Sequence, residues 1–295
     1  MASRRGRTEW ATLAVAAAIY GGWLAATYWH AALPTPLLVA IGAWLIAWHG
    51  SLQHETIHGH PTRIAAINRA IGFVPIGLWL PYALYERSHV AHHRSGAITD
   101  PAHDPESRYV ARAGGVVWLA ARAQSTLPGH ILIGPFVAVG RFLAGEARRV
   151  AVEPVQVARD WLPHLAGVAL IVLWLDHVGL GIGEYVATFV YPGMALTMVR
   201  SFAEHRAGLG TAGHAASVER AGLFGLLFLN NNLHVAHHEQ PGLGWRELPA
   251  YHRRHRARLT GEGAILYAGY GEIARRFAWR RHDAPLHPAY AEEAA

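Results

Sequence analysis

Two long apolar stretches, 10–53 and 161–202, dominate the hydrophobic pattern of the chain. Each is long enough for two membrane crossings, because one helix needs roughly 20 residues to span a bilayer core. A short turn-forming segment divides each stretch, at 31–35 and at 176–184. The pattern therefore predicts an all-α integral membrane protein whose four transmembrane helices form two hairpins, at about 10–29, 36–53, 161–176 and 185–203.

The more polar segments, 54–160 and 204–282, are predicted to form a helical cap outside the bilayer, within one domain that covers residues 1–295. Within the cap, 64–84 is apolar but interrupted by prolines and a glycine, which favours an interfacial or re-entrant segment. The segment 116–149 mixes apolar side chains with arginines, a pattern typical of amphipathic helices at a membrane surface. The tail, 283–295, is predicted to be disordered.

The positions of the arginines predict the orientation of the chain. All 26 basic residues are arginine, and none lies between Thr8 and Thr62 or between Asp160 and Val199. Both hairpin turns therefore lie on the side without arginine, and the positive-inside rule places both termini and the cap in the cytoplasm. A cleaved signal peptide is the alternative for the N-terminus, but the apolar run exceeds a typical signal core and a second hydrophobic segment follows at once.

Composition narrows the possible chemistry. Hydrophobic residues make up 52% of the chain and charged residues 16%, as suits a membrane protein. The absence of cysteine excludes disulfides, thiolate zinc sites and iron–sulfur ligation by this chain. A net charge of +6 could indicate nucleic-acid binding, but the one-sided arginines, including the run 253–258, favour membrane lipid headgroups and argue against nucleic acid.

Histidines are concentrated in three separated clusters. Within each cluster the spacing is three or four residues, so a helix would place the imidazoles on one face. The pattern H-x-x-H-H occurs twice, at 89–93 and 234–238. Neutral imidazole is the commonest transition-metal ligand in proteins, and every cluster maps to the cytoplasmic side. A further histidine ends the fourth predicted helix at the same depth, so the predicted metal ligands are His54, His58, His89, His92, His93, His205, His234, His237 and His238.

These clusters resemble the histidine boxes of the integral-membrane fatty acid desaturase and hydroxylase superfamily. The boxes read HETIHG at 54–59, HVAHH at 89–93 and NNNLHVAHH at 230–238. The resemblance covers roughly residues 10 to 250 and is greatest to bacterial fatty acid desaturases, which implies a bacterial inner membrane. It implies two non-haem irons, O2 as oxidant and a double bond introduced into an acyl or acyl-like substrate, or else hydroxylation or ketolation of a lipid or carotenoid. Glu55 departs from the aspartate common in acyl desaturases.

An almost entirely histidine ligand set brings no negative charge, so polar side chains are expected to hydrogen-bond the ligands and orient them. The candidates are Glu55, Glu204, Asn231, Asp100 and Asp104. The sequence has no recognisable electron-carrier module, so an external donor is expected, such as a ferredoxin or a cytochrome b5-like protein. An arginine-rich cytoplasmic face would attract an acidic carrier.

A zinc metalloprotease and a metal transporter are the two alternatives to an oxidase. His54, Glu55 and His58 also satisfy H-E-x-x-H, the motif of zinc metalloproteases, but a protease gives no reason for the two H-x-x-H-H clusters. A metal transporter would need ligands inside the spans. Histidines outside the clusters, such as His30 and His287, are expected to be dispensable.

Overall fold

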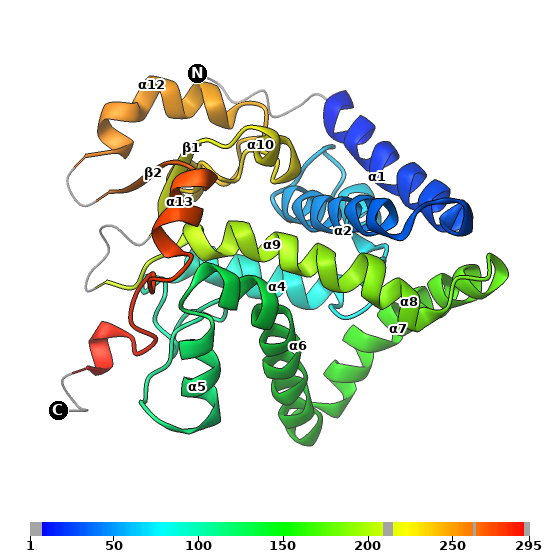
Figure 1. Cartoon of the computed structure of the whole chain (residues 1–295), viewed down its shortest axis with the longest axis horizontal. Coiled ribbons are helices and arrows are strands. Elements are labelled where there is room, and N and C mark those ends of the chain that lie inside the picture. The colour runs from blue at the N-terminus through cyan, green and yellow to red at the C-terminus, as the bar shows by residue number, and fades with distance from the viewer. Residues whose placement is uncertain (1–7, 209–214, 262–263, 292–295) are drawn as a thin grey trace. The chain divides into compact units, whose positions relative to one another are not determined.

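The computed structural model describes residues 8–208, 215–261 and 264–291 (Figure 1). The chain is mostly helical, which confirms the predicted class. It divides into two compact units: the first comprises the residues up to Glu86 and Pro135–Thr197, and the second comprises Arg87–Gly134 and the residues from Met198 onward. The ends of the polypeptide, 1–7 and 292–295, lie outside the described residues, as does 209–214 of the predicted cap.

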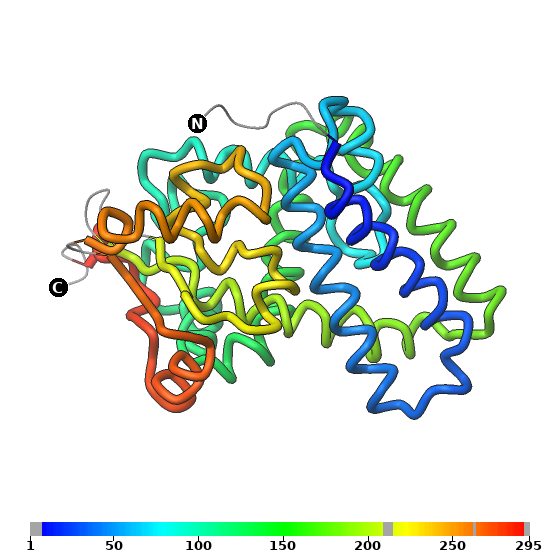
Figure 2. The backbone as a smooth tube through the Cα atoms, turned by 90° about the horizontal axis from the view of Figure 1, so that it is seen from above, coloured from blue at the N-terminus to red at the C-terminus, as the bar shows by residue number. Residues whose placement is uncertain are grey.

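The first unit contains the N-terminal hairpin. Helix α1 (Trp10–Tyr28) is followed by the short 3-10 turn η1 (His30–Ala32) and by α2 (Thr35–Ile57), which begins with a proline in its first turn, where no donor is lost. The two helices run side by side in Figures 1 and 2. Helix α3 (Ala65–Phe73) packs against α2, and α4 (Tyr82–Arg94) begins in this unit.

The second predicted hairpin is also present, and its second arm is a helix interrupted by a π-helical turn. Helix α7 (Pro154–His177) leads to a continuous helical run made of α8 (Ile182–Tyr185), the π-helical turn η2 (Val186–Val190) and α9 (Tyr191–Glu204). The run and α2 approach closely through small residues: a Cβ at Gly42 would lie 2.5 Å from the Thr188 carbonyl oxygen, and one at Gly193 would lie 2.4 Å from Ile46. Such backbone proximity is typical of helices packed within a bilayer.

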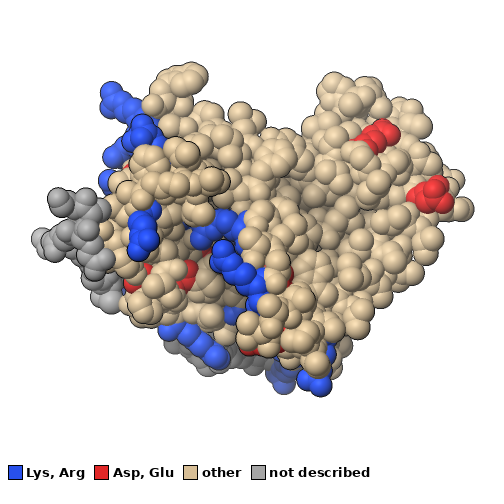
Figure 3. Space-filling model, turned by 90° about the horizontal axis from the view of Figure 1, so that it is seen from below, with Lys and Arg blue, Asp and Glu red and all other residues tan. Residues whose placement is uncertain are grey.

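Polar contacts join the helices of this unit. The Trp23 indole donates to the Tyr185 hydroxyl (2.8 Å), which donates to the Ile76 carbonyl (2.6 Å). Trp174 on α7 donates to the Thr27 hydroxyl on α1 (3.0 Å). The outer face of α7 is different, because it exposes a stripe of leucines: Leu162, Leu165, Leu170 and Leu173. Figure 3 shows a broad area of the surface without Lys or Arg side chains. A large exposed apolar face such as that of α7 marks a membrane or protein contact.

Four described helices are long and apolar enough to cross a membrane, namely Trp10–Tyr28, Thr35–Ile57, Leu127–Val152 and Pro154–His177. The third is α6, in a stretch expected to form surface helices, where the structure has α5 (Gly115–Ala123) and one helix of 26 residues. The predicted span 185–203 is helical, although the π-turn divides it. At the far end of α6, Arg149 pairs with Glu146 (2.7 Å) and Asp160 (2.8 Å), so this end carries charge.

The second unit contains a feature that the sequence did not predict. Strand β1 (Ala216–Arg220) pairs in parallel with β2 (Ile265–Gly269), with Ala216 opposite Ile265. Between them lie α10 (Leu223–Leu227), α11 (His234–Glu239) and α12 (Leu248–Leu259). Helix α13 (Tyr270–Phe277) follows β2, and a turn of 3-10 helix, η3 (Pro288–Tyr290), lies near the end of the described chain.

The expectation of a disordered tail is wrong for residues 283–291. The amide of Val110 donates to the Pro285 carbonyl (3.0 Å), and the amide of His287 donates to the Val110 carbonyl (3.0 Å). His287 is buried at 4% exposure. The expectation that His287 is dispensable for activity stays a prediction, although its side chain is not a free surface group. The tail lacks an apolar pattern, and its order comes from hydrogen bonds to a distant loop.

Candidate metal centre

Two helices of the second unit present the histidine boxes 89–93 and 234–238. In α4 and in α11 the spacing of three and four residues places three imidazoles on one helix face. Helix α11 is held from both sides. Leu233 and Ala236 pack with Leu248 and Leu259 of α12, and the Asn232 side chain donates to the Val218 carbonyl of β1 (2.7 Å).

The seven predicted ligands of this unit form two groups. The first, here called the His92 group, comprises His92, His205, His234 and His238, whose ligand nitrogens all lie within 4.8 Å of one another. The second, called the His93 group, comprises His89, His93 and His237, within the same limit. The remaining two predicted ligands belong to the first unit, where His54 lies in the last turn of α2 and His58 caps its end, with ring centroids 4.7 Å apart.

The nitrogens within each group approach one another closely. In the His92 group, Nε2 of His234 lies 2.9 Å from Nε2 of His205 and 3.1 Å from Nε2 of His238. In the His93 group, Nε2 of His93 lies 3.1 Å from that of His89 and 3.0 Å from that of His237. Nitrogens bound at about 2.1 Å to one ion and separated by a right angle lie about 3 Å apart. The spacing therefore fits ligands of a shared ion.

Three of the predicted ligands have their other ring nitrogen engaged by an oxygen. His92 Nδ1 lies 2.8 Å from the Asp104 carboxylate, His89 Nδ1 lies 3.2 Å from the Glu106 carboxylate, and His234 Nδ1 lies 3.0 Å from Oδ1 of Asn231. An acceptor at Nδ1 selects the tautomer with the proton there and leaves the Nε2 lone pair directed into the group. Two such lone pairs repel each other at 3 Å, whereas a cation between them attracts both.

Burial keeps several of these imidazoles neutral. It lowers the pKa of His93 to about 3, with the neighbouring His89 and His92 acting in the same direction. It also places the pKa values of His234 and His238 well below the ordinary range. Burial opposes protonation of His92 too, but the hydrogen bond to Asp104 and the nearby carboxylates raise its pKa overall. Neutral imidazole is the form that binds a metal.

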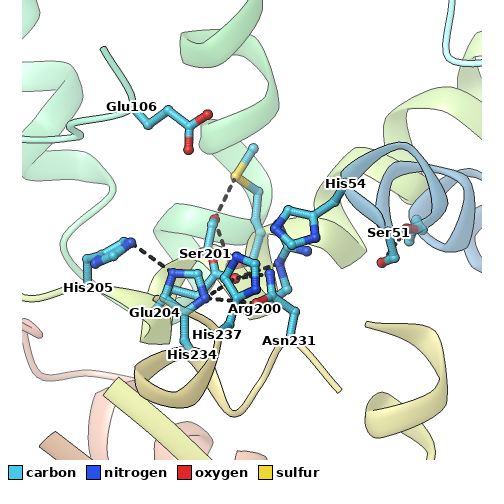
Figure 4. A network of polar contacts seen from close by, with 12 residues as sticks. Ser51, His54, Glu106, Arg200, Ser201, Glu204, His205, Asn231, His234 and His237 are labelled. Carbon is cyan, nitrogen blue, oxygen red and sulfur yellow. Dashed lines mark hydrogen bonds and ion pairs between the residues drawn. The ribbon is translucent and has the colours of Figure 1, made fainter. Parts of the chain in front are cut away.

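The polar residues predicted to support the ligands differ in how closely they approach the box histidines. Asp104 and Asn231 contact box histidines, as described above. Glu204 lies 3.6 Å from His234 Nδ1 and pairs with Arg200 at 2.7 Å (Figure 4). Glu55 is buried, and its carboxylate lies 3.9 Å from the ring of the adjacent His54.

Asp100 does not contact a box histidine in the part of the chain that the structure describes. It accepts from His103 Nδ1 (2.8 Å), the Ala102 amide (2.9 Å) and the Tyr290 hydroxyl (2.8 Å). This prediction is therefore corrected, because Asp100 shapes the loop that carries Asp104.

Glu106 was missed by the sequence reasoning. Both of its carboxylate oxygens lie 3.2 Å from His89 Nδ1. Burial raises its pKa, but electrostatic interaction with the nearby His89 and a hydrogen bond to the same ring, together with His92 and His205, lower it to about 2. A signal for it was present, since Glu106 follows Asp104 by two residues in the same acidic loop.

We expect Glu106→Gln to weaken metal binding by the His93 group. Partners that orient a ligating histidine typically contribute 10- to 100-fold to metal affinity, and an amide keeps the size of the side chain while removing its charge. The expected result is a loss of about tenfold in zinc affinity at one of two sites, measured by chelator competition. The same affinity as wild type at both sites would show that Glu106 has no such role.

The family comparison agrees with the box geometry. A family model described as fatty acid desaturase matches residues 27–270, which include every predicted ligand. The chain belongs to the fatty acid desaturase family. Comparison with curated proteins gives no match. The match to a desaturase model favours oxidation over the protease reading of His54, Glu55 and His58.

Proposed function

We propose that this desaturase-family protein introduces a double bond into a fatty-acyl or acyl-like hydrophobic substrate, using two irons, O2 and electrons from an external donor. The observation that carries the proposal is the pairing of two groups of close imidazole nitrogens in one chain of this family. Two irons with O2 supply the oxidising power to take hydrogen from an unactivated C–H bond, which side chains alone lack.

The proposed ligand set comprises all nine box and helix-end histidines. The His92 group offers four nitrogens, whereas the His93 group offers three. His54, in the last turn of α2, and His58, which caps that helix, are the proposed additional ligands. In the proposed centre Asp104, Glu106 and Asn231 accept the outward N–H groups of their histidines and so keep the inward nitrogens unprotonated.

Electrons are proposed to come from an acidic carrier such as a ferredoxin or a cytochrome b5-like protein. The chain supplies no cysteine for an iron–sulfur cluster. Helix α12, which packs on the box helix α11, carries the exposed Arg253. Positive charge on this face would steer a negatively charged carrier toward the metal centre.

The experiment that tests the reaction is mass spectrometry of lipids from cells that express the chain, with a His92→Ala variant as control. The proposal expects acyl chains that have lost the mass of two hydrogens, in wild-type cells alone. Gain of one oxygen would show hydroxylation instead. Identical lipids in both cell lines would contradict oxidation of a cellular lipid.

We also propose that both termini and the histidine boxes lie in the cytoplasm of a bacterium, with the turns near Pro34 and Gly181 outside. The one-sided arginines support this orientation. The charged contacts of Glu146, Arg149 and Asp160 support a cytoplasmic level for the α6–α7 junction.

Reporter fusions test this topology. Fusions at Pro34 and Gly181 should report an external location, and a fusion after Ala295 an internal one. An internal result at either turn would contradict the map, because one hairpin would then not return to the side that carries the histidines.

A further inference from the structure

The loop 99–107, here called the carboxylate loop, carries the two acids that contact box histidines. Asp104 has a fixed place in it. One carboxylate oxygen accepts from His92 Nδ1 (2.8 Å) and from the Glu106 amide (2.9 Å), and the other accepts from the Thr99 amide (2.8 Å). The direction of the Asp104 side chain, and with it the ring of His92, therefore depends on the conformation of Thr99.

Thr99 adopts a conformation that it would not adopt by itself. Its φ is +77°, which is uncommon for a β-branched residue. A conformation of this kind persists where the surroundings over-determine it. Here the Ser107 hydroxyl donates to the Thr99 carbonyl, and His287 Nε2 lies 3.2 Å from the Thr99 hydroxyl. One of these supports comes from the other end of the unit's sequence.

His287 belongs to the segment 282–291, here called the C-terminal segment, which binds along the carboxylate loop and the residues just after it. The Tyr290 hydroxyl donates to Asp100 (2.8 Å), and backbone hydrogen bonds join Val110 to Pro285 and His287, as described above. Both the beginning of the carboxylate loop, at Asp100, and Val110, three residues after its end, are therefore hydrogen-bonded to the same ten-residue segment.

The C-terminal segment also reaches a second ligand of the His92 group. The Asp283 carboxylate accepts from Arg108 (3.2 Å) and from the Tyr109 hydroxyl. The Arg108 guanidinium in turn donates to the carbonyl oxygen of His205 (3.4 Å), and the Tyr109 hydroxyl accepts from the amide of Ala207 (2.9 Å). These bonds hold the backbone on both sides of Arg206, at His205, which directly follows α9, and at Ala207.

We propose that the C-terminal segment is a positioning element of the metal centre. Through Thr99 and Asp104 it orients His92, and through Arg108 it places His205, so both paths end in the same four-nitrogen group. The proposal rests on the proposed metal function, but it assigns a role to residues that lie outside every histidine box and far from them in sequence.

The test uses the full chain with the substitutions His287→Phe and Tyr290→Phe together. Both keep an aromatic ring while removing the hydrogen bonds to Thr99 and Asp100; the ring at 290 keeps its size, and the one at 287 becomes larger. The metal-stripped protein is titrated with zinc against a chelator, which resolves each binding step without any need for catalysis. Ala284→Ser, at an exposed position of the same segment, is the matched control. His287→Gln is the rescue variant, because its amide can reach the Thr99 hydroxyl.

We expect one of the two zinc-binding steps to weaken about tenfold in the double variant, as for other partners that orient a ligating histidine. The second step, the amount of membrane-inserted protein and the control should be unchanged, and His287→Gln should recover most of the affinity. Asp283→Asn should weaken the same step through Arg108.

Two results would overturn the inference. One is wild-type affinity at both steps in the double variant and in Asp283→Asn. The other is an equal loss at both steps, which would indicate general destabilisation rather than positioning. Failure of the proposed function is distinguishable from failure of this inference. In that case the wild-type protein itself would not show two zinc-binding steps.

Discussion

Replacing His205 by alanine should abolish the oxidised product while leaving membrane-inserted protein. His205 belongs to no box, yet its Nε2 lies 2.9 Å from that of His234, and its ring centroid lies 4.9 Å from that of His92. Removing one of four clustered nitrogens should release the metal of the His92 group. The apolar packing and internal hydrogen bonds of the membrane helices do not depend on that metal. The measurements are lipid mass spectrometry and metal content of the purified protein.

The matched control for this experiment is His30→Ala. His30 lies in the turn after α1, where its Nδ1 contacts the Thr27 carbonyl (2.8 Å), and it lies in neither group. Its loss should leave product and metal content unchanged. Full activity and full metal content in His205→Ala would show that the proposed ligand set counts one histidine too many. His93→Ala and His238→Ala should behave as His205→Ala does.

The second large effect is expected for Asp104→Ala. The substitution removes the acceptor of His92 Nδ1–H and the acceptor of the Thr99 and Glu106 amides at once. His92 then loses both its tautomer preference and its orientation. Metal affinity at the His92 group should fall by about 10- to 100-fold, as measured by chelator competition, with a parallel fall in product.

Glu219→Ala provides the matched control for Asp104→Ala. Glu219 is also a carboxylate that contacts a histidine, since His252 Nε2 lies 3.0 Å from it, and it pairs with Arg256 as well. That histidine lies in no box, so metal affinity should not change. Equal losses of affinity in the two variants would mean that Asp104 acts on the fold as a whole rather than on His92.

The sequence was sufficient to predict the helices that carry the apolar pattern and the spacing of the ligands. The runs 10–29 and 36–53 coincide closely with α1 and α2, because a long apolar stretch without charge forms a helix wherever backbone groups must pair internally. The boxes fold as helices, so their three- and four-residue spacings brought imidazoles together as expected. The position of His205 at the end of an apolar run led to its prediction as a ligand, and its Nε2 lies 2.9 Å from that of His234.

The rest depended on contacts that periodicity does not encode. The arginines of the stretch, such as Arg141 and Arg149, favoured short surface helices, although the apolar part of α6 is long enough for a membrane crossing. The parallel pairing joins β1 (Ala216–Arg220) to β2 (Ile265–Gly269), two strands that lie far apart in the sequence. Neither strand has an alternating pattern of buried and exposed residues that would specify its partner. Which carboxylate meets which histidine was equally inaccessible, because Asp100, Asp104 and Glu106 differ only in the direction that the loop gives them.

The measurement that tests the central claim most directly is the metal content of full-length protein purified from iron-grown cells, set beside His93→Ala and His238→Ala. The account predicts about two metal ions per chain in the wild type, with zinc replacing iron in part because nitrogen ligands hold zinc more tightly than ferrous iron. Each variant should retain about one. A single ion that depends only on His54 and His58, accompanied by peptide cleavage that Glu55→Ala abolishes, would contradict it and support the protease.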